Sequence, residues 1–206
     1  LPGRVVEGRI HHHAVRAVLD DRDQPVTVYS ASAAGQCLIA GMLCNDSQLV
    51  KKDNQWTIQG DPTEGALYVS GRKAGFDEHK LNKGFPRIDS IPFESERQYM
   101  ATLHRQAGSA EPVLYVKGAM EKVLEKCASR LDAAGNRQEL DRRAAAGLAD
   151  SLADQGLRVL AFACGSLPAG QTFSAAGVPD DLVFLGFQAM IDPPRLTMPM
   201  TRSIAR

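Results

Sequence analysis

The order of elements along the chain predicts an α+β fold with a largely antiparallel sheet flanked by helices. Most of the apolar, extended segments come as neighbouring pairs joined by short turns, which is typical of hairpins. Segments with apolar residues at helical spacing lie between these pairs, so a regular series of strand–helix–strand units with a parallel sheet is not expected. A length of 206 residues suits one large domain.

The expected strands are bounded by turn residues. Asp53-Asn54 turns the first hairpin, Gly108 lies in the loop of the second, and Pro193-Pro194 ends the last strand. The segments expected to be extended are Val26–Tyr29, the hairpin Leu49–Gly60, Ile88–Phe93, the pair Met100–Arg105 and Val113–Lys117, Leu157–Cys164, and Leu182–Ile191.

Four helices are expected, and the second carries the clearest end signals. Asp61 suits the N-cap, Pro62 the first helical position and Glu64 the third, while Gly75 suits the end. The expected helices are Ser32–Asn45, Asp61–Gly75, Gly118–Ala128 and Leu140–Gln155. The segments Gly75–Gly84, Asp132–Arg137 and Gly165–Pro179 are expected to be loops or turns.

Charge and cysteine usage exclude several classes of protein. The chain has 24 basic and 24 acidic residues, so no overall positive field attracts a polyanion such as DNA, and an anionic ligand needs a local group of cations. The four cysteines form no CxxC pair, which favours reduced, buried thiols in a cytosolic setting over zinc or disulfides. No apolar run approaches the 18–20 or so residues of a membrane-spanning helix.

Two features near the ends of the chain lead to further expectations. His11–His13 cannot converge on one ion in an extended segment, because neighbouring side chains point to opposite faces, so a surface loop or strand is favoured. The chain begins without Met and ends at Ile204-Ala205-Arg206, which indicates a piece of a longer protein.

Two segments contain residues that could recognise a nucleotide base. A carboxylate at Glu64 could accept a hydrogen bond from an exocyclic amine, or it could close a capping box at the start of its helix. Phe93 could stack on a base at the edge of a strand, or it could belong to the core. The residues alone leave both alternatives open.

Two further segments contain cations that could meet phosphate. Lys117 ends a strand that leads into a helix, whose free N–H groups favour anions. Arg158 begins an otherwise apolar strand, and a guanidinium can pair with phosphate oxygens in a bidentate manner. Each could instead be a solvated residue at the end of a strand.

Five motifs, taken in order, resemble the nucleotide-binding domain of P-type cation ATPases. The similarity is greatest to the branch that includes calcium pumps, sodium/potassium pumps and their bacterial relatives. The motifs are GDPTEGAL (60–67), IPFESER (91–97), VKGA (116–119), GLRVLAFA (156–163) and FQAMIDPPR (187–195). The resemblance covers roughly Ala33 to Arg195, and its specificity comes from the order and spacing of the five motifs together.

The resemblance implies a role for each matching residue. Glu64, with Thr63 beside it, would meet the adenine amino group, and Phe93 would stack on the ring, with Ser95 at the mouth of the pocket. Lys117 would lie against the purine and ribose, where Gly118 allows close approach. The resemblance further implies that Arg158 reaches the phosphates, that Leu160 packs the floor, and that Asp192, Pro193, Pro194 and Arg195 form a hinge.

The same resemblance implies where the domain ends and which part of the ATPase reaction it contributes. Residues 1–191 would form the nucleotide-binding domain, and 192–206 the hinge and the start of the return to a phosphorylation domain. The DKTGT motif that carries the family's phosphorylated aspartate is absent from the sequence. The chain is therefore expected to bind ATP with Mg²⁺ and to present its γ-phosphate to an aspartate elsewhere, without hydrolysing ATP alone.

The resemblance also implies that the chain is a cytosolic part of an integral membrane protein. Its expected partners are the phosphorylation and actuator domains of the same parent chain. The sequence departs from the family pattern at Gln98, where many members carry lysine, and at Met120, where proline is usual. The alternative functions are a module that keeps the fold as a regulatory or protein-interaction surface, and a free-standing phosphohydrolase. The intact set Glu64, Phe93, Lys117 and Arg158 argues against the first, and the missing nucleophile motif against the second.

Overall fold

A computed structural model of the chain describes residues 18–19, 24–52, 55–168, 170–173 and 177–191. Its centre is a seven-stranded sheet with the strand order β5-β6-β7-β10-β11-β8-β9. Neighbouring strands are antiparallel except for β8 and β11, which run parallel. The predicted α+β class with a largely antiparallel sheet is confirmed.

The elements follow one another with short connections. The strands of the central sheet are β5 (Arg87–Ile91), β6 (Tyr99–His104), β7 (Val113–Gly118), β8 (Cys127–Leu131), β9 (Arg137–Glu139), β10 (Leu157–Ser166) and β11 (Leu182–Ile191). The helices are α1 (Ala33–Leu43), α2 (Pro62–Lys73), α3 (Glu78–Gly84), α4 (Met120–Glu125) and α5 (Arg142–Ala153). Two small two-stranded sheets consist of β1 (Val18–Leu19) with β2 (Pro25–Val26), and β3 (Gln48–Lys52) with β4 (Gln55–Gln59).

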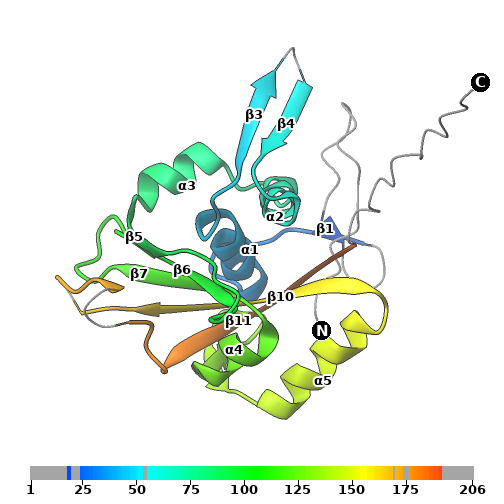
Figure 1. Cartoon of the computed structure of the whole chain (residues 1–206), viewed down its shortest axis with the longest axis vertical. Coiled ribbons are helices and arrows are strands. Elements are labelled where there is room, and N and C mark those ends of the chain that lie inside the picture. Colours follow the sequence, from blue (N-terminus) through cyan, green and yellow to red (C-terminus); the bar gives the residue numbers. More distant parts are fainter. Residues whose placement is uncertain (1–17, 20–23, 53–54, 169, 174–176, 192–206) are drawn as a thin grey trace, which may run out of the picture.

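Helices cover both faces of the sheet and create two hydrophobic cores. The α1 core contains buried residues of α1 such as Ile39 and Leu43, and the α4 core contains Val123 and Leu124 of α4. Figure 1 shows α1 and α2 on one side and α4 and α5 on the other. Because successive side chains of a strand point to opposite faces, Tyr115 of β7 packs in the α1 core and its neighbours Leu114 and Val116 pack in the α4 core. The α1 core also includes Phe162 of β10. Each core therefore fixes one face of the same strands.

Local capping signals account for the helix ends that the sequence predicts. Ser32 caps α1 by accepting a hydrogen bond from the Gly35 N–H, and Asp61 caps α2 by accepting from Thr63 and Glu64. Gly75 follows the end of α2 with a φ of +91°, a conformation that glycine adopts without strain. The predicted hairpin with its turn at 53–54 corresponds to β3 and β4, which project from the body beside α2 (Figure 1).

The structure corrects several predicted elements. The segment 75–84, expected as a loop, contains helix α3, which Asp77 caps through the Lys80 N–H. The predicted helix Gly118–Ala128 ends at Glu125, and Cys127 begins β8 instead, because β8 gains a partner in the distant strand β11. The turn 132–137 leads into strand β9, and the strand predicted at Val26–Tyr29 is only β2.

Some predicted features lie outside the described residues, and others concern membrane-spanning helices and cysteines. His11–His13 and the hinge with the domain boundary at 192 lie outside them. No helix in the described ranges combines the length and the apolar character that crossing a bilayer requires. All four cysteines are free thiols, and Cys164 alone among them is half-buried rather than buried.

His104, at the end of β6, is a buried imidazole held in one tautomer. Its Nδ1 lies 2.8 Å from the Phe85 carbonyl oxygen, which can only accept, so Nδ1 carries the proton. Its Nε2 lies 2.9 Å from the Thr102 hydroxyl, which therefore donates. Burial lowers the pKa of His104 from 6.5 to about 4, although the hydrogen bond to Phe85 opposes the shift.

We expect His104 to make the fold sensitive to mild acid. Because its folded-state pKa lies below the ordinary value of 6.5, the neutral ring contributes fully above that pH, and the contribution is lost as the pH falls toward about 4. Between pH 7 and pH 5 this costs about 2 kcal/mol of unfolding free energy. Urea unfolding at the two pH values measures this change in the free energy of unfolding. His104→Gln should remove most of the change.

The matched control is His79→Gln, because His79 is exposed on α3 and stays in water in both states. This variant should keep the wild-type difference between pH 7 and pH 5. If His104→Gln retains the same pH dependence as the wild type, the buried imidazole is not its source.

Candidate functional site

The residues of the candidate site gather where β6 and β10 begin and β7 ends. In the sheet register Met100 lies opposite Lys117, and Lys117 lies opposite Phe162. Residues in one such row share a face, and Met100 and Phe162 belong to the α1 core. The Lys117 side chain therefore projects to the face that α1 and α2 cover.

The Glu64 carboxylate, in the first turn of α2, meets Lys117 on that face. The Lys117 Nζ lies 2.5 Å from Glu64 Oε1, and the two side chains are 8% and 17% exposed. Glu64 Oε2 accepts hydrogen bonds from the Asp46 N–H at 3.0 Å, the Ser47 N–H at 3.0 Å and the Ser47 hydroxyl at 3.2 Å. The carboxylate thus joins α2 to β7 and to the loop before β3, while Asp61 caps α2 with its own side chain.

This ion pair is largely buried. A Cys44 thiol close to it is fully buried, and burial raises its pKa despite the opposing charge of Lys117. Removing one partner of a buried pair leaves the other charge uncompensated, so Glu64 and Lys117 depend on each other. The ammonium of Lys117 has three N–H donors, of which Glu64 takes one.

Phe93 lies in the connection between β5 and β6, at the same end of the sheet. Its side chain is 60% exposed, so the alternative that it is a core residue is wrong. Ser95, two residues later, is exposed in the turn that a hydrogen bond from the Gln98 N–H to the Glu94 carbonyl closes. A large aromatic ring held in water is available for stacking.

Gly118 and Gln98 join this connection to the end of β7. A Cβ at Gly118 would lie 2.3 Å from the Gln98 carbonyl oxygen and 2.7 Å from the Tyr99 Cα. The close approach that Gly118 permits in this structure is therefore to the backbone of the neighbouring strand. Gln98 itself has a φ of +57°, and its carbonyl accepts from the Ala119 N–H at 2.9 Å.

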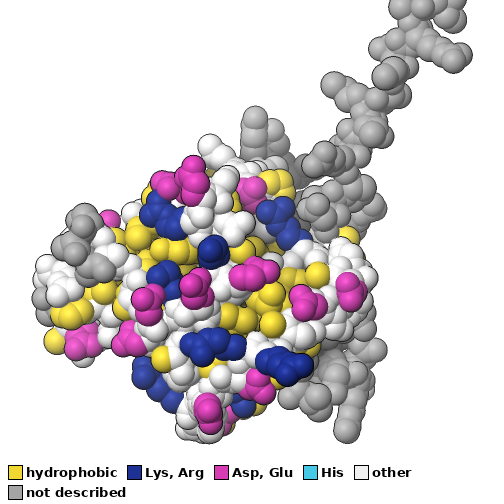
Figure 2. Space-filling model, turned by 60° about the horizontal axis from the view of Figure 1, so that its bottom comes forward, with side chains coloured by type: hydrophobic (Ala, Val, Ile, Leu, Met, Phe, Trp, Pro, Cys, Tyr) yellow, Lys and Arg dark blue, Asp and Glu magenta, His cyan; other side chains and the backbone are white. Residues whose placement is uncertain are grey.

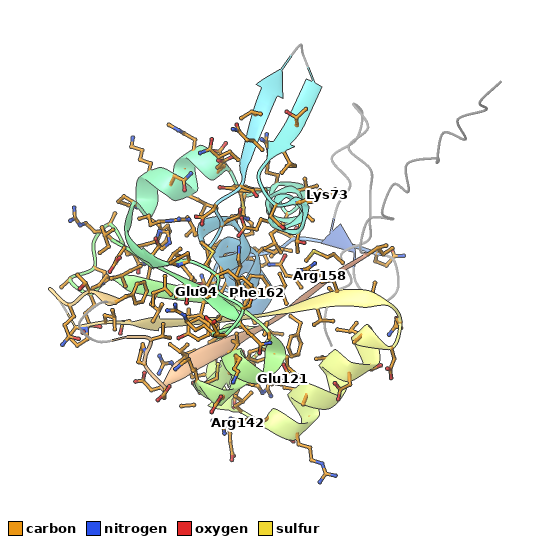
Figure 3. The ribbon with its side chains drawn as sticks, in the orientation of Figure 1. Lys73, Glu94, Glu121, Arg142, Arg158 and Phe162 are labelled. Carbon is orange, nitrogen blue, oxygen red and sulfur yellow. The ribbon has the colours of Figure 1, made fainter. Side chains whose placement is uncertain are left out.

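Arg158 and Leu160 extend the same face of the sheet along β10. Both lie an even number of residues from Phe162 along the strand, so their side chains project to the same face, which α1 and α2 cover. Leu160 packs against the α1 core, and Arg158, labelled with Phe162 in Figure 3, is exposed. Arg158 lies four positions before Phe162, so it is roughly 13 Å along the strand from the row that contains Lys117.

The Arg158 charge acts on Asp61 at the start of α2. Partial burial would by itself raise the pKa of Asp61, but hydrogen bonds from Glu64 and Thr63 and the Arg158 charge hold it below its usual range. Thr63, half-buried, donates its N–H to Asp61 Oδ1 at 2.8 Å. The start of α2 thus lies between the Lys117 row and Arg158.

The structure therefore directly joins Glu64 and Lys117, and it places Arg158 within electrostatic reach of Asp61. Phe93 and Ser95 lie on the adjoining loop between β5 and β6, and no hydrogen bond joins them to the ion pair among the described residues. Sequence reasoning missed three residues of the site, Asn45, Asp46 and Ser47, which form the loop after α1. Their signal was a run of small polar residues directly after a buried helix.

Neither of two surface hollows is lined by Glu64, Phe93, Lys117 or Arg158. One of about 470 Å³ is lined by residues 139–142 at the start of α5. The other, of about 460 Å³, is lined by Glu96, Arg97, Tyr99, Lys122, Glu125, Lys126 and Asp180. Figure 2 shows basic and acidic side chains interspersed on the face that it presents, so no field of one sign extends over that face.

Comparison with known proteins finds similar sequences among cation-transporting ATPases. The chain is 48% identical over 161 residues to a cation-transporting ATPase of Synechocystis sp., an alignment that covers 78% of this chain and 18% of the relative. It is 43% identical over 185 residues to a probable cation-transporting ATPase F of Mycobacterium bovis, covering 85% of this chain and 19% of the relative. A calcium-transporting ATPase of Bacillus subtilis is 32% identical over 176 residues, with 84% and 20% covered.

These relatives are much longer than the chain, which spans about a fifth of their length. The family described as "P-type ATPase, cytoplasmic domain N" matches residues 35–197. This range includes all of α1 except its first two residues, together with α2, the central sheet and all the site residues described above. The chain therefore belongs to the P-type cation ATPase family, as its domain N.

Proposed function

We propose that this chain binds ATP as the nucleotide-binding domain of a P-type ion-transporting ATPase. The observation that carries the proposal is the pairing of an exposed aromatic ring with a buried ion pair at one end of the sheet. Phe93 is 60% exposed, whereas the side chains of Glu64 and Lys117 are 17% and 8% exposed. A base can stack on the first and form hydrogen bonds with the second.

Glu64 and Lys117 supply groups of opposite character for a base and its sugar. The Glu64 carboxylate accepts a hydrogen bond from the exocyclic amine of adenine, and the remaining N–H donors of Lys117 face purine nitrogens or the ribose. A 6-oxo purine such as guanine presents an acceptor to the same carboxylate, which leaves two acceptors opposed. The site is therefore selective for adenine.

Arg158 and Leu160 extend the site away from the base. The spacing along β10 separates Arg158 from the Lys117 row, which suits an elongated ligand with a base at one end and phosphates at the other. Arg158 contributes charge that its exposed guanidinium can direct to phosphate oxygens. Leu160 packs against the α1 core and would form part of the floor of the site. Gln98 adds no charge.

Mg²⁺ enters this proposal together with the nucleotide. Within the described residues no group of three or more His, Cys, Asp or Glu side chains is arranged to hold a metal ion. The ion would neutralise phosphate charge when bound. The residues of this chain would hold the base and part of the phosphate charge, and so position the γ-phosphate for an aspartate in a phosphorylation domain elsewhere in the parent protein.

In the parent protein the chain would act as a cytosolic domain of an integral membrane protein. Its partners would be the phosphorylation and actuator domains, to which residues 192–206 would lead as a hinge. Asp192, Pro193, Pro194 and Arg195 are the residues proposed for this hinge.

We expect the chain to bind ATP, ADP and AMP with affinities that rest mainly on the base, and to bind GTP more weakly. The reason is that the Glu64 carboxylate favours an amine over a carbonyl group at the base. Titration followed by amide chemical shifts measures the four affinities. Equal affinity for GTP and ATP would contradict base recognition by Glu64.

We expect Phe93→Ala and Arg158→Ala to weaken binding in different ways. Loss of stacking should cost about 1–3 kcal/mol, or about five- to hundredfold, and equally for ATP, ADP and AMP, because all three carry the same ring. Loss of the Arg158 charge should weaken ATP more than AMP, and added salt should narrow that gap. Calorimetric titration of each variant measures both effects.

The matched controls are Tyr29→Ala, for another exposed aromatic ring, and Arg143→Ala, for an exposed arginine on α5. Neither should change nucleotide affinity. Because Phe93 is exposed, Phe93→Ala should also leave the melting temperature nearly unchanged. If Phe93→Ala and Arg158→Ala weaken every nucleotide by one common factor, the division between base and phosphate is wrong.

We expect the purified chain to form no phosphoenzyme and to hydrolyse no ATP above the buffer rate. The DKTGT motif that would supply the accepting aspartate is absent from the sequence. Incubation with γ-labelled ATP followed by acid precipitation tests this. An acid-stable label on the protein would reveal a nucleophile within the chain.

A further inference from the structure

The loop that follows α1 holds one oxygen of the Glu64 carboxylate. The N–H groups of Asp46 and Ser47 each lie 3.0 Å from Glu64 Oε2, and the Ser47 hydroxyl lies 3.2 Å from it. A carboxylate oxygen has about two lone-pair positions, so the loop fills those of Oε2. The Oε1 atom, which Lys117 contacts, keeps one position for a further donor.

Asn45 ties this loop to α1 and to the backbone of Glu64. Its Nδ2 donates to the Gly41 carbonyl at 2.9 Å and to the Glu64 carbonyl at 2.8 Å, and its Oδ1 accepts from the Ser47 N–H at 2.9 Å. Asn45 and Ser47 are both buried. One amide side chain therefore fixes both the loop and the residue whose carboxylate the loop holds.

Two neighbours restrict the loop further. Arg87 of β5 donates to the carbonyl groups of Asn45 at 2.6 Å and Leu43 at 3.0 Å, and it pairs with the Asp46 carboxylate at 2.6 Å. A Cβ at Gly60 would lie 2.4 Å from the Ser47 Oγ, so only glycine lets the chain before α2 pass this close. Asn45, Arg87 and the chain at Gly60 therefore restrict the loop. Because the loop itself has little freedom, it can hold the Glu64 carboxylate in one orientation.

We propose that Asn45 and Ser47 are positioning residues that determine base selectivity. Ser47 holds Glu64 Oε2 directly, and Asn45 holds Ser47 and the Glu64 backbone in place, so that Oε1 remains the acceptor directed at Lys117 and at the amine of the base. This inference rests on the proposed binding of ATP. Neither residue touches the base. Both act through the orientation of Glu64, because a carboxylate free to rotate would lose its distinction between an amine and a carbonyl group.

The test compares ATP with inosine triphosphate, which carries a carbonyl oxygen in place of the adenine amine. Dissociation constants are measured with the 206-residue chain for the wild type, Asn45→Ala, Ser47→Ala and Glu64→Gln, and for the two double variants that add Glu64→Gln. We expect each single change to lower the ATP preference by about three- to tenfold, the scale of a weakened hydrogen bond to a charged group. In the Glu64→Gln background neither should lower it further.

The matched control is Ser70→Ala, because Ser70 also lies on α2, nearly two turns after Glu64. The Ser70 hydroxyl donates to the Leu67 carbonyl and contacts Gln188 Oε1, so its loss removes similar hydrogen bonds away from Glu64. This variant should keep the wild-type preference for ATP. The Ser47 hydroxyl lies 3.1 Å from the Asp61 carbonyl oxygen as well as 3.2 Å from Glu64 Oε2, and its one proton is shared between these two acceptors. Ser47→Ala is expected to fold, because Glu64 Oε2 keeps two N–H donors and the Asp61 carbonyl keeps its bond from the Gly65 N–H. Thermal melting of each variant checks this.

The outcomes separate the inference from the function on which it rests. If the wild type prefers ATP while Asn45→Ala and Ser47→Ala keep that preference, even with lowered melting temperatures, the two residues are only structural and the inference is overturned. A further loss of preference in the Glu64→Gln background would also overturn it, because the loop would then act on the base without Glu64. A wild type that binds both nucleotides equally would contradict adenine recognition itself.

Discussion

The ion pair between Glu64 and Lys117 is the contact on which the geometry of the site depends. It joins the first turn of α2 to the end of β7 across 53 residues of sequence, and both side chains are largely excluded from water. Removing one partner of such a pair typically costs about 3–5 kcal/mol, because the other charge is left buried and uncompensated. The pair therefore holds α2 against the sheet and places a carboxylate and an ammonium side by side.

The sheet register decides which side chains can join this pair. Lys117 lies in one row with Met100 and Phe162, and the alternation along β10 puts Arg158 on the same face. Gly118 allows the next row to close against the backbone of Gln98 and Tyr99. A shift of one residue in any of these strands would turn the charged side chains toward the α4 core instead.

Burial divides the site into rigid and accessible parts. Glu64 and Lys117 are packed among the polar groups of the loop after α1, whose hydrogen bonds leave them little freedom. Phe93 and Arg158 are exposed at the margin, where a ligand can reach them without moving the core. Rigid polar groups suit discrimination, because misplaced ligand atoms leave them unpaired, whereas an exposed ring suits affinity for any base.

Local signals in the sequence were sufficient for the elements that depend on neighbouring residues. Asp61 and Pro62 predicted the start of α2, and the run 182–191 matched β11, because caps and breakers act within one turn or one strand. The exposure of Phe93, the pairing of Cys127 with β11 and the partners of Glu64 depended on the tertiary structure. Glu64 had two local interpretations, a cap and a base contact, and its position in the helix favoured neither. Its bonds to Ser47 and Lys117 form only when α1, α2 and β7 pack together, and no local pattern encodes contacts between segments so far apart.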